Sequence, residues 1–307
     1  PGRRERVQIR MSRSQRKIKT IIPKTEIRKR IFITMNLLCT VSCISYLFHM
    51  EKGTDLRRVL QAAYEQKISP DEAMAQICAS SVLPVGSVAC LDISRKARCG
   101  IPEVILAEGK EPPHLRSIAE SYVRSAGRCI ISRLDPETAV SLMEWARTRD
   151  ISSSWSDVGR VLVLSTTAGP EKTGGIVGII TAGTSDIRVA EEAGVIAEEM
   201  GCEVRKAYDV GVAGIHRLFP VIDEMQGCHA FVVAAGREGT LPSVVAGLVD
   251  RPVIGVPVST GYGYMGAGQA ALASMLQSCS VLTVVNIDAG FVAGASAAMI
   301  ANLAVKS

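Results

Sequence analysis

Five glycine-rich segments hold most of the residues whose types could do chemistry. Each contains glycine, and most add a hydroxyl, a charge or an amide; they are residues 181–186, 208–217, 234–242, 257–263 and 286–290. Glycine lets the backbone approach a ligand closely, and helix N-termini favour phosphate. A single such segment could be an ordinary turn, but five in succession favour a site for a phosphate-bearing small molecule.

An apolar, strand-like run precedes each of these segments. The runs begin near residues 176, 204, 230, 253 and 281, and a helix-length stretch follows each one. This spacing suits βα units of roughly 30 residues or slightly fewer. We therefore predict an open, doubly wound α/β domain over 174–307, with a flavodoxin-like parallel sheet and helices on both faces. Ligands bind beyond the carboxyl ends of such strands, where all five segments would meet.

The preceding part of the chain, residues 50–170, is predicted to be a small α+β domain. Strands are expected at 88–93, 104–107 and 161–165. Helices are expected at 55–66, 113–126 and 135–147, together with a helix that begins after Ser69, whose S-x-x-E spacing to Glu72 is a capping box. Asp135 is expected to cap the helix at 135–147. Between two of the strands lie Arg95 and Arg98, which could be a solvated loop or could bind a substrate phosphate.

Residues 1–49 have a different composition. Of the 35 Lys and Arg residues, twelve lie in residues 1–50 with two acidic residues, so this stretch carries +10 and the remainder −5. A basic run is followed by the uncharged residues 31–48, as in a signal or anchor segment. Alternatively, the segment is non-native sequence preceding a body that opens at Met50. We expect a body without a membrane segment.

The composition of the body excludes several classes of protein. Its mild acidity gives no case for nucleic-acid binding. The nine cysteines form no Cys-x-x-Cys pair and no even framework, which argues against a zinc site or a disulfide scaffold. A reducing, cytoplasmic location is expected, with most cysteines acting as small buried apolar residues.

Several long motifs carry a resemblance to a known family. The blocks GIITAGTSDIRVAEEA, AGIHR and VVAAGREGTLPSVVAGLVDRPVIGVPVSTGYG resemble PurE-type aminoimidazole ribonucleotide (AIR) carboxylase domains. With IPEVILAEGK and LQSCSVLTVVNIDAGF added, residues 50–305 resemble the LarB family. That family is pyridinium-3,5-biscarboxylic acid mononucleotide synthase, which acts in nickel-pincer cofactor biosynthesis.

The resemblance implies a reaction and roles for particular residues. LarB-like enzymes carboxylate the nicotinate ring of nicotinic acid adenine dinucleotide with CO2 and cleave its phosphoanhydride, releasing AMP. The near-terminal cysteine thought to add to the pyridinium ring corresponds to Cys279. Asp186 and His216 correspond to residues that handle the substrate and its protons. The third-segment acid is Glu238, a tentative ligand for Mg²⁺ in phosphoanhydride cleavage, for which Asp186 is the alternative.

Further residues of the segments are expected to bind the substrate. They are Gly183, Thr184, Ser185, Gly211, Gly214, Arg217, Ser259, Gly261 and Tyr262, with Arg95 and Arg98 from the middle domain. One departure from the LarB pattern is Arg237, where methionine is usual; its charge could help to bind an anionic dinucleotide or could displace Glu238. PurE-like proteins are oligomers, so we expect an even-numbered homo-oligomer such as an octamer. The apolar last helix, 291–305, would be buried between its subunits.

Each candidate also has an ordinary structural interpretation. Cys279 could be a buried cysteine at the end of the helix 269–278, and that helix end lies at the opposite sheet edge from the glycine-rich segments, so a neighbouring subunit would have to supply it. Asp186 could simply start a helix. At the level of function, the alternatives are an aminoimidazole ribonucleotide carboxylase or mutase and a non-catalytic nucleotide-binding regulator. Against the first, the third segment has no histidine, and PurE has no middle domain.

Overall fold

The computed structural model describes residues 56–79, 82–85, 89–92 and 95–306 of the 307. The chain divides into two compact units, Pro1–Ser80 and Ser81–Ser307. The predicted tail, 1–49, lies outside the described residues. Among the described helices, none combines the length and the apolar character that crossing a bilayer requires.

The described part of the first unit is a pair of helices, α3 (Leu56–Tyr64) and α4 (Pro70–Ala79). The predicted capping box is confirmed at the start of α4. The Ser69 hydroxyl accepts the Glu72 backbone N–H at 3.1 Å, and the Glu72 carboxylate accepts the Ser69 backbone N–H at 2.8 Å. These reciprocal bonds satisfy two N–H groups that a helix start leaves without partners.

The second unit contains the predicted flavodoxin-like sheet. Its five strands are β7 (Ile176–Thr181), β8 (Glu203–Ala207), β9 (Ala230–Ala235), β10 (Val253–Pro257) and β11 (Thr283–Val284). All are parallel, in the order β11-β10-β9-β7-β8. Counted along the chain, this is the 2-1-3-4-5 order of flavodoxin-like folds, so the predicted fold class is confirmed.

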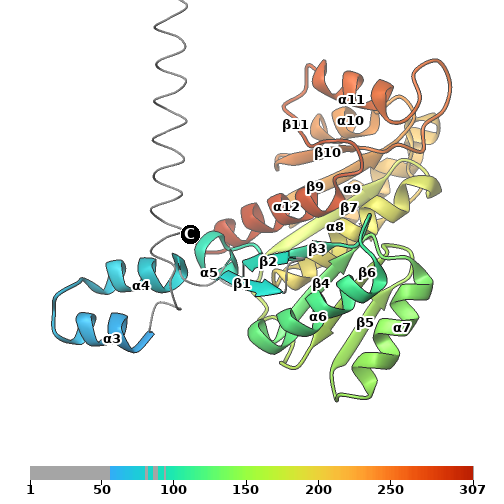
Figure 1. Cartoon of the computed structure of the whole chain (residues 1–307). Coiled ribbons are helices and arrows are strands. Elements are labelled where there is room, and N and C mark those ends of the chain that lie inside the picture. The colour runs from blue at the N-terminus through green and yellow to red at the C-terminus, as the bar shows by residue number, and fades with distance from the viewer. Residues whose placement is uncertain (1–55, 80–81, 86–88, 93–94, 307) are drawn as a thin grey trace, which may run out of the picture. The chain divides into compact units, whose positions relative to one another are not determined.

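Helices cover both faces of this sheet (Figure 1). Successive side chains of a strand point to opposite faces, and in β7 Ile179 packs on one side and Ile180 on the other. One face carries α8 (Ile187–Glu199) and α12 (Gly290–Ala304), and the other carries α9 (Leu218–Glu224), α10 (Leu241–Ala246) and α11 (Gln269–Leu276). The central strands are therefore apolar throughout their length.

Helices α8 and α12 approach each other closely because α12 is rich in small residues. A Cβ added to Gly290 would lie 2.4 Å from the Val189 carbonyl oxygen, and one on Gly294 would lie 2.2 Å from that of Ala193. The uncharged sequence of α12 is thus largely buried within its own chain. Its exposed apolar residues, Val292 (45%), Met299 (38%) and Leu303 (65%), are seven and four residues apart and so share one stripe, and only this stripe remains available for the expected second subunit.

A second, four-stranded sheet follows the order β3-β4-β6-β5. Strands β3 and β4 are parallel, and β4, β6 and β5 pair antiparallel. A separate hairpin of β1 and β2 precedes it along the chain. The elements of this region are β1 (Val82–Val85), β2 (Ala89–Asp92), α5 (Arg95–Cys99), β3 (Val104–Leu106), α6 (Pro112–Ala126), β4 (Arg128–Ser132), α7 (Pro136–Arg147), β5 (Ser152–Ser156) and β6 (Val161–Ser165).

The four-stranded sheet also has two covered faces. One face, with Ile131 and Leu164, packs on α6 and α7. The other face, with Ile130 and Val163, packs on the same core cluster as α8 and α12. Helices α8 and α12 therefore form a layer shared by both sheets. The small domain of the structure runs from β1 to β6, because α3 and α4, which the sequence predicts to lie in the same domain, belong to the first unit.

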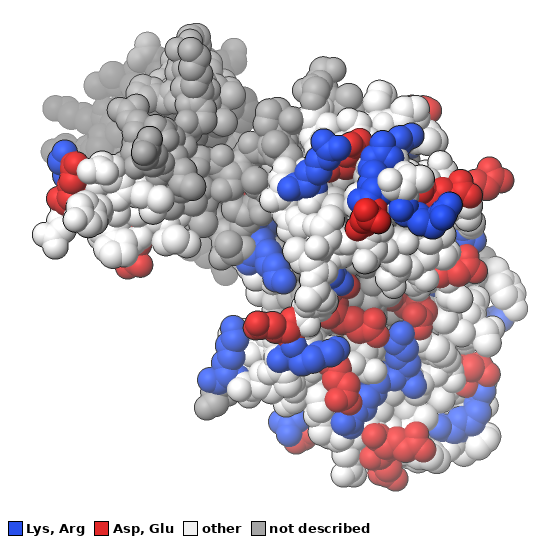
Figure 2. Space-filling model, turned by 90° about the horizontal axis from the view of Figure 1, so that it is seen from below, with Lys and Arg blue, Asp and Glu red and all other residues white. Residues whose placement is uncertain are grey.

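Most predicted elements of the small domain are confirmed within a few residues, including β6 and the Asp135 cap of α7, where Asp135 accepts the Thr138 N–H at 2.9 Å. Three strands, β1, β4 and β5, were not predicted. The segment Arg95–Cys99, interpreted as a solvated loop or phosphate contact, forms the short helix α5. On the face shown in Figure 2, acidic and basic side chains are interspersed.

Candidate functional site

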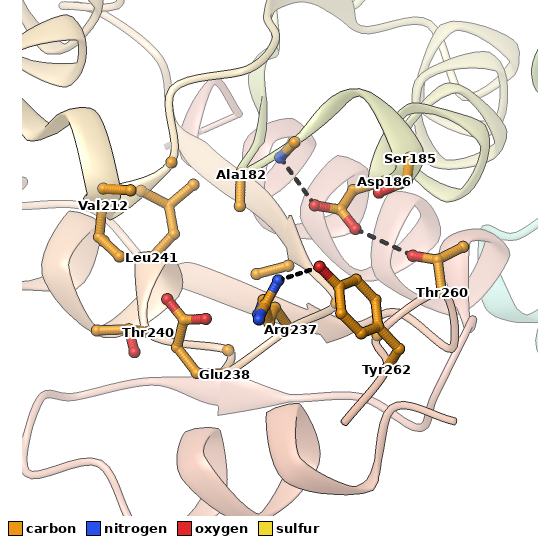
Figure 3. A pocket seen from close by; sticks show the side chains of 17 residues that line it. Ala182, Ser185, Asp186, Val212, Arg237, Glu238, Thr240, Leu241, Thr260 and Tyr262 are labelled. Atoms are coloured by element: carbon orange, nitrogen blue, oxygen red, sulfur yellow. Dashed lines mark hydrogen bonds between the residues drawn. The ribbon is translucent and has the colours of Figure 1, made fainter. Parts of the chain in front are cut away.

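A pocket of about 290 Å³ lies beyond the carboxyl ends of β7, β8, β9 and β10, where the sequence places four of its five glycine-rich segments. The carboxyl ends of the parallel strands meet there, and the loops that follow them make most of the walls, together with Ala235 of β9 and Leu241 of α10. The pocket is lined by Ala182, Gly183, Ser185, Asp186, Gly211, Val212, Ala213, Ala235, Gly236, Arg237, Glu238, Gly239, Thr240, Leu241, Thr260, Gly261 and Tyr262 (Figure 3).

The carboxylate of Asp186 is the buried charge of this pocket, with 3% of the residue exposed. It accepts a hydrogen bond from the Gly183 backbone N–H at 2.9 Å and one from the Thr260 hydroxyl at 3.5 Å. Burial raises the pKa of Asp186, while these bonds oppose the rise. Asp186 makes no side-chain bond to the start of α8, but its bond to the Gly183 N–H is a capping contact of the 3₁₀ helix Thr184–Asp186, so the carboxylate both caps that short helix and faces the pocket.

Glycines allow the pocket loops to lie against one another. A Cβ on Gly261 would lie 2.0 Å from the Gly236 carbonyl oxygen, and one on Gly211 would lie 2.6 Å from that of Ala182. A Cβ on Gly236 would meet the Asp186 carboxylate and the Thr260 hydroxyl, both at 2.9 Å. Real Cβ atoms do not approach this closely, so these positions require glycine for the observed backbone path.

Arg237 and Tyr262 connect two sides of the pocket. The Arg237 Nη1 donates to the Tyr262 hydroxyl at 2.5 Å, and its guanidinium carbon lies 4.4 Å from the ring centroid. Figure 3 shows the two side chains pointing toward each other. Both are exposed, and Tyr262 is 72% exposed, so a ligand can reach the cation and the ring.

The carboxylates of the pocket suit a metal that is held mainly by its substrate. Within the described residues, no group of three His, Cys, Asp or Glu side chains is placed to hold a metal ion. Asp186 already accepts protein hydrogen bonds, whereas Glu238 is exposed on the pocket wall. Mg²⁺ commonly binds through one or two carboxylates plus substrate phosphates, and Glu238 fits that pattern.

Several predicted binding residues lie near the pocket but outside its lining. His216 is exposed, in the short 3₁₀ helix Val212–Arg217 whose first two residues do line the pocket. Arg217 forms an ion pair with Asp209 at 2.9 Å. The remaining residues of this kind are Thr184, Gly214 and Ser259. Gly183, Ser185, Gly211, Gly261 and Tyr262 line the pocket as expected.

Cys279 lies away from the pocket of its own chain. It follows α11 and precedes β11, so it lies where the parallel strands begin, at the end of the sheet opposite the pocket. The side chain is exposed and its thiol is free, in contrast to the interpretation as a buried cysteine. The next residue, Ser280, donates its hydroxyl to the Ser243 carbonyl at 2.9 Å, which holds this turn against α10.

The two arginines proposed from the middle domain lie in α5. Arg95 forms an ion pair with Glu103 at 3.0 Å, so its guanidinium has a partner within the small domain. The side chain of Arg98 lies outside the described residues. Neither residue lines the described pocket.

Nine pocket residues were not singled out from the sequence: Ala182, Val212, Ala213, Ala235, Gly236, Gly239, Thr240, Leu241 and Thr260. They lie within the predicted glycine-rich segments, but their types gave no reason to select them. Thr260 meets Asp186 from 74 residues away along the chain. The signal that could have found them is their position directly after a strand, rather than their chemistry.

Two family models match the chain. The AIR carboxylase model covers residues 176–307, and the LarB/PurE-like N-terminal domain model covers residues 84–166. An uncharacterized protein of Methanocaldococcus jannaschii is 40% identical over 259 residues, which are 83% of this chain and 100% of that protein. The chain belongs to the LarB family. Its LarB N-terminal and PurE-like domains correspond to the two sheets described above.

The PurE-like domain is also similar to shorter enzymes. N5-carboxyaminoimidazole ribonucleotide mutases of M. jannaschii and Thermotoga maritima are 39% and 34% identical over 83 and 90 residues. The matches cover 26% and 27% of this LarB-family chain and 50% of each mutase, so the chain spans about half the length of these relatives. The family is one of PurE-related carboxylases and mutases.

Proposed function

We propose that this LarB-family chain carboxylates the nicotinate ring of nicotinic acid adenine dinucleotide with CO2. In the same proposal it hydrolyses the phosphoanhydride, releasing AMP and leaving pyridinium-3,5-biscarboxylic acid mononucleotide for nickel-pincer cofactor synthesis. The observation that carries the proposal is the buried Asp186 carboxylate, which faces a glycine-lined pocket in a chain whose two domains both match this family.

The size and walls of the pocket suit one half of such a dinucleotide. Ligand sites commonly enclose about 300–1,000 Å³, so 290 Å³ is at the small end and suits a mononucleotide. Backbone N–H groups of the glycine loops can approach phosphate oxygens without side-chain obstruction. The Arg237 cation, beside the Tyr262 ring, offers a charge for phosphate or carboxylate and a face for an aromatic ring.

In the proposed mechanism a thiolate first makes the ring nucleophilic. A pyridinium ring is electron-poor and does not attack CO2. Addition of the Cys279 thiolate at C4 gives a dihydropyridine whose C5 has enamine character, so C5 attacks the carbon of CO2 and forms the new carboxylate. Transfer of the C5 proton to a base and expulsion of the thiolate restore the aromatic ring. Because Cys279 lies at the opposite edge of its own sheet, a neighbouring subunit would supply it.

Asp186 is the proposed proton acceptor at C5, with His216 as the alternative. A buried carboxylate with a raised pKa accepts a proton more readily than an exposed one, and a residue of this kind contributes about 10²–10⁴-fold to a rate. Glu238 would hold Mg²⁺ together with the substrate phosphates, and the ion would neutralise charge during phosphoanhydride hydrolysis.

The test of the proposed reaction is direct. The protein is incubated with nicotinic acid adenine dinucleotide, labelled bicarbonate and Mg²⁺, and the products are followed by mass spectrometry. We expect AMP and a labelled dicarboxylated mononucleotide in equal amounts, and formation of the labelled product slowed by about 10²–10⁴-fold in Asp186→Asn. Binding of the dinucleotide without any product would instead favour a nucleotide-binding regulator.

A second candidate is supported by the names of the curated relatives. A chain similar to N5-carboxyaminoimidazole ribonucleotide mutases could move a carboxylate between the nitrogen and carbon atoms of that ribonucleotide. The same assay with N5-carboxyaminoimidazole ribonucleotide distinguishes the two. Isomerisation of that compound, without turnover of the dinucleotide, would favour the mutase.

The covalent mechanism requires an assembly, because the pocket and the thiol lie at different edges of one sheet. We propose an even-numbered homo-oligomer, such as an octamer. Exposed apolar side chains near Cys279 and the pocket, including Val281 (95% exposed) and Tyr264 (103% exposed), are available for contacts with a second copy. Light scattering at micromolar concentration tests this, and a monomer would contradict it.

A further inference from the structure

Two polar contacts fasten strand β4 of the small domain to helix α8. At the start of β4, Arg128 forms a bidentate ion pair with Glu199, in which Nη2 lies 2.7 Å from Oε1. At its end, the Ser132 hydroxyl donates to the buried carboxylate of Glu192. These residues are seven apart on α8, so they share one face of the helix. The small domain is thus anchored at both ends of one strand.

Arg133, the next residue, extends beyond this anchoring. Its backbone has φ of 55°, an uncommon conformation for a residue other than glycine, and the guanidinium is part-buried. Nη2 donates to the Asp288 carbonyl at 2.7 Å, and Nη1 pairs with Glu108 at 3.1 Å. Nε is buried 3.9 Å from the Glu192 carboxylate. One side chain therefore joins the small domain, α8 and the segment before α12.

Asp288 in turn holds the pocket loop that follows β10. It also has a left-handed backbone, with φ of 56°. Its carboxylate accepts the Ser259 backbone N–H at 2.9 Å, and its own N–H donates to the Pro257 carbonyl at 2.9 Å. The next three residues of the loop, 260–262, line the pocket, and Thr260 donates to Asp186. Figure 3 shows Thr260 beside Asp186 and Tyr262 beside Arg237.

We propose that Arg133 is a positioning residue through which the small domain sets the shape of the pocket. The contacts run from Arg133 to Asp288, from Asp288 to Ser259, and from there to the residues that meet Asp186 and Arg237. The inference deepens the proposed function, on which its kinetic part rests. Arginine suits this place because its planar fork donates in several directions at once, which a lysine ammonium on a flexible stem does not reproduce.

The experiment compares two arginines of the same strand. Arg133→Met removes the donors at the pocket end, and Arg128→Met removes the ion pair at the far end. In the full chain, without substrate, hydrogen exchange of the backbone at 257–264 should rise about tenfold in Arg133→Met, the effect expected for losing a charge-assisted hydrogen bond. Arg128→Met should lower the melting temperature and leave exchange at 257–264 unchanged.

A second variant keeps the test informative if Arg133→Met does not fold. Asp288→Ala removes the acceptor for Ser259 and should raise exchange of the loop to the same extent. Asp288→Asn keeps an acceptor oxygen and tolerates a left-handed backbone, so it should leave the loop close to wild type. Arg133→Lys, which keeps the charge, should recover only part of the protection.

Enzyme kinetics supply the second readout. If the chain turns over the dinucleotide, Arg133→Met should raise KM about tenfold with a smaller change in kcat, because the loop then has to be ordered by the substrate. Equal exchange at 257–264 in Arg133→Met and Arg128→Met would overturn the inference, since Arg133 would then only join the domains. The exchange measurement needs no turnover, so failure of the proposed reaction is distinguished from failure of this inference.

Discussion

The five parallel strands of the larger sheet all begin at one end of the sheet, here called the amino edge, and all finish at the other, the carboxyl edge. Polar residues have different roles at these two ends. At the amino edge, His229 accepts the Ile176 backbone N–H at 3.0 Å, and Thr173 donates to Asn302 at 2.6 Å. Such polar groups are satisfied by neighbours within the chain. At the carboxyl edge, Asp186 is as buried as a core residue but faces a pocket. The position of a residue in the topology, more than its type, therefore separates structural from functional candidates.

The largest effect is expected at Cys279, which lies at the amino edge of its own sheet but is proposed to act in a pocket at the carboxyl edge. We expect Cys279→Ala to abolish carboxylation, with a loss of about 10³-fold or more, while dinucleotide binding stays near normal. Cys279→Ser should be nearly as inactive, because a hydroxyl ionises far less than a thiol. Mass spectrometry of wild type with substrate should find a dihydropyridine adduct on the Cys279 peptide.

A mixing experiment tests whether a second copy supplies the thiol. Inactive Cys279→Ala and Asp186→Asn chains, dissociated and reassembled together, should recover partial activity, because some sites then combine an intact pocket with an intact thiol. Full turnover by Cys279→Ala, with no adduct in wild type, would sink the covalent mechanism. His216 or a bound metal would then have to activate the ring.

The glycine packing at the carboxyl edge can be broken by one methyl group. Gly261→Ala would place its Cβ 2.0 Å from the Gly236 carbonyl oxygen, whereas Gly266→Ala, five residues along the same loop, meets its nearest neighbour at 3.4 Å. Overpacking costs about 1–3 kcal/mol, so Gly261→Ala should weaken AMP binding by roughly 10–100-fold. Calorimetry should find Gly266→Ala close to wild type. Equal affinities in the two variants would show that the loop path is not needed for binding.

The free energy of unfolding is expected to depend on pH through Glu192, which lies on α8 between the two sheets. Burial raises the pKa of Glu192 above its usual 4.5, and the Ser132 hydroxyl, Arg133 and Arg188 oppose the rise. The folded protein therefore keeps this proton to higher pH than the unfolded chain. The stability contributed by the protonated form is complete below 4.5 and is lost as the pH rises through the folded pKa.

Glu192→Gln removes this titration while keeping an acceptor for Ser132. Urea unfolding from pH 4 to 8 should show the unfolding free energy of the variant rising relative to that of wild type as the pH rises. Parallel curves for the two proteins would mean that Glu192 titrates alike in the folded and unfolded states. AMP binding should change little, because Glu192 lies between the two sheets and does not line the pocket.

The smallest effect is expected at the amino edge. Cys202 is fully buried, with its thiol 3.3 Å from the Asn302 amide oxygen. Cys202→Ala removes one buried atom and should cost about 1 kcal/mol of unfolding free energy. Ligand affinity at the opposite edge should stay the same. A change in affinity would show that the two edges are coupled through the sheet.

The sequence predicts the larger sheet well because its three central strands, β7, β9 and β10, are buried on both faces and read as apolar runs. It fails at β5, whose sequence SSSWS has no apolar pattern. That strand lies at the edge of its sheet and forms through backbone pairing with β6, which does not depend on side-chain type. Strand β4 is short and lies between two helices, so its four buried residues leave only a brief signal.

The pocket, too, has features that the sequence predicts and contacts that it does not. The rule that ligands bind beyond the carboxyl ends of parallel strands predicts a pocket at the glycine-rich segments, and the resemblance to PurE-type domains selects Asp186 within them. The contact between Thr260 and Asp186 joins residues 74 apart, and that between Arg133 and Asp288 joins residues 155 apart. Such pairs depend on how the layers pack, which neither periodicity nor motif spacing reports.

The shared position of α8 has a consequence for how its sequence can change. A helix on the surface has an exposed stripe where substitutions are tolerated. Of the residues Ile187–Glu199, Arg188 alone is exposed, because one sheet covers each side of the helix and α12 packs beside it. A replacement in α8 must satisfy both sheets at once. Evolution along this lineage should therefore alter α8 more slowly than α9, and a change in one domain should often be matched by a change in the other.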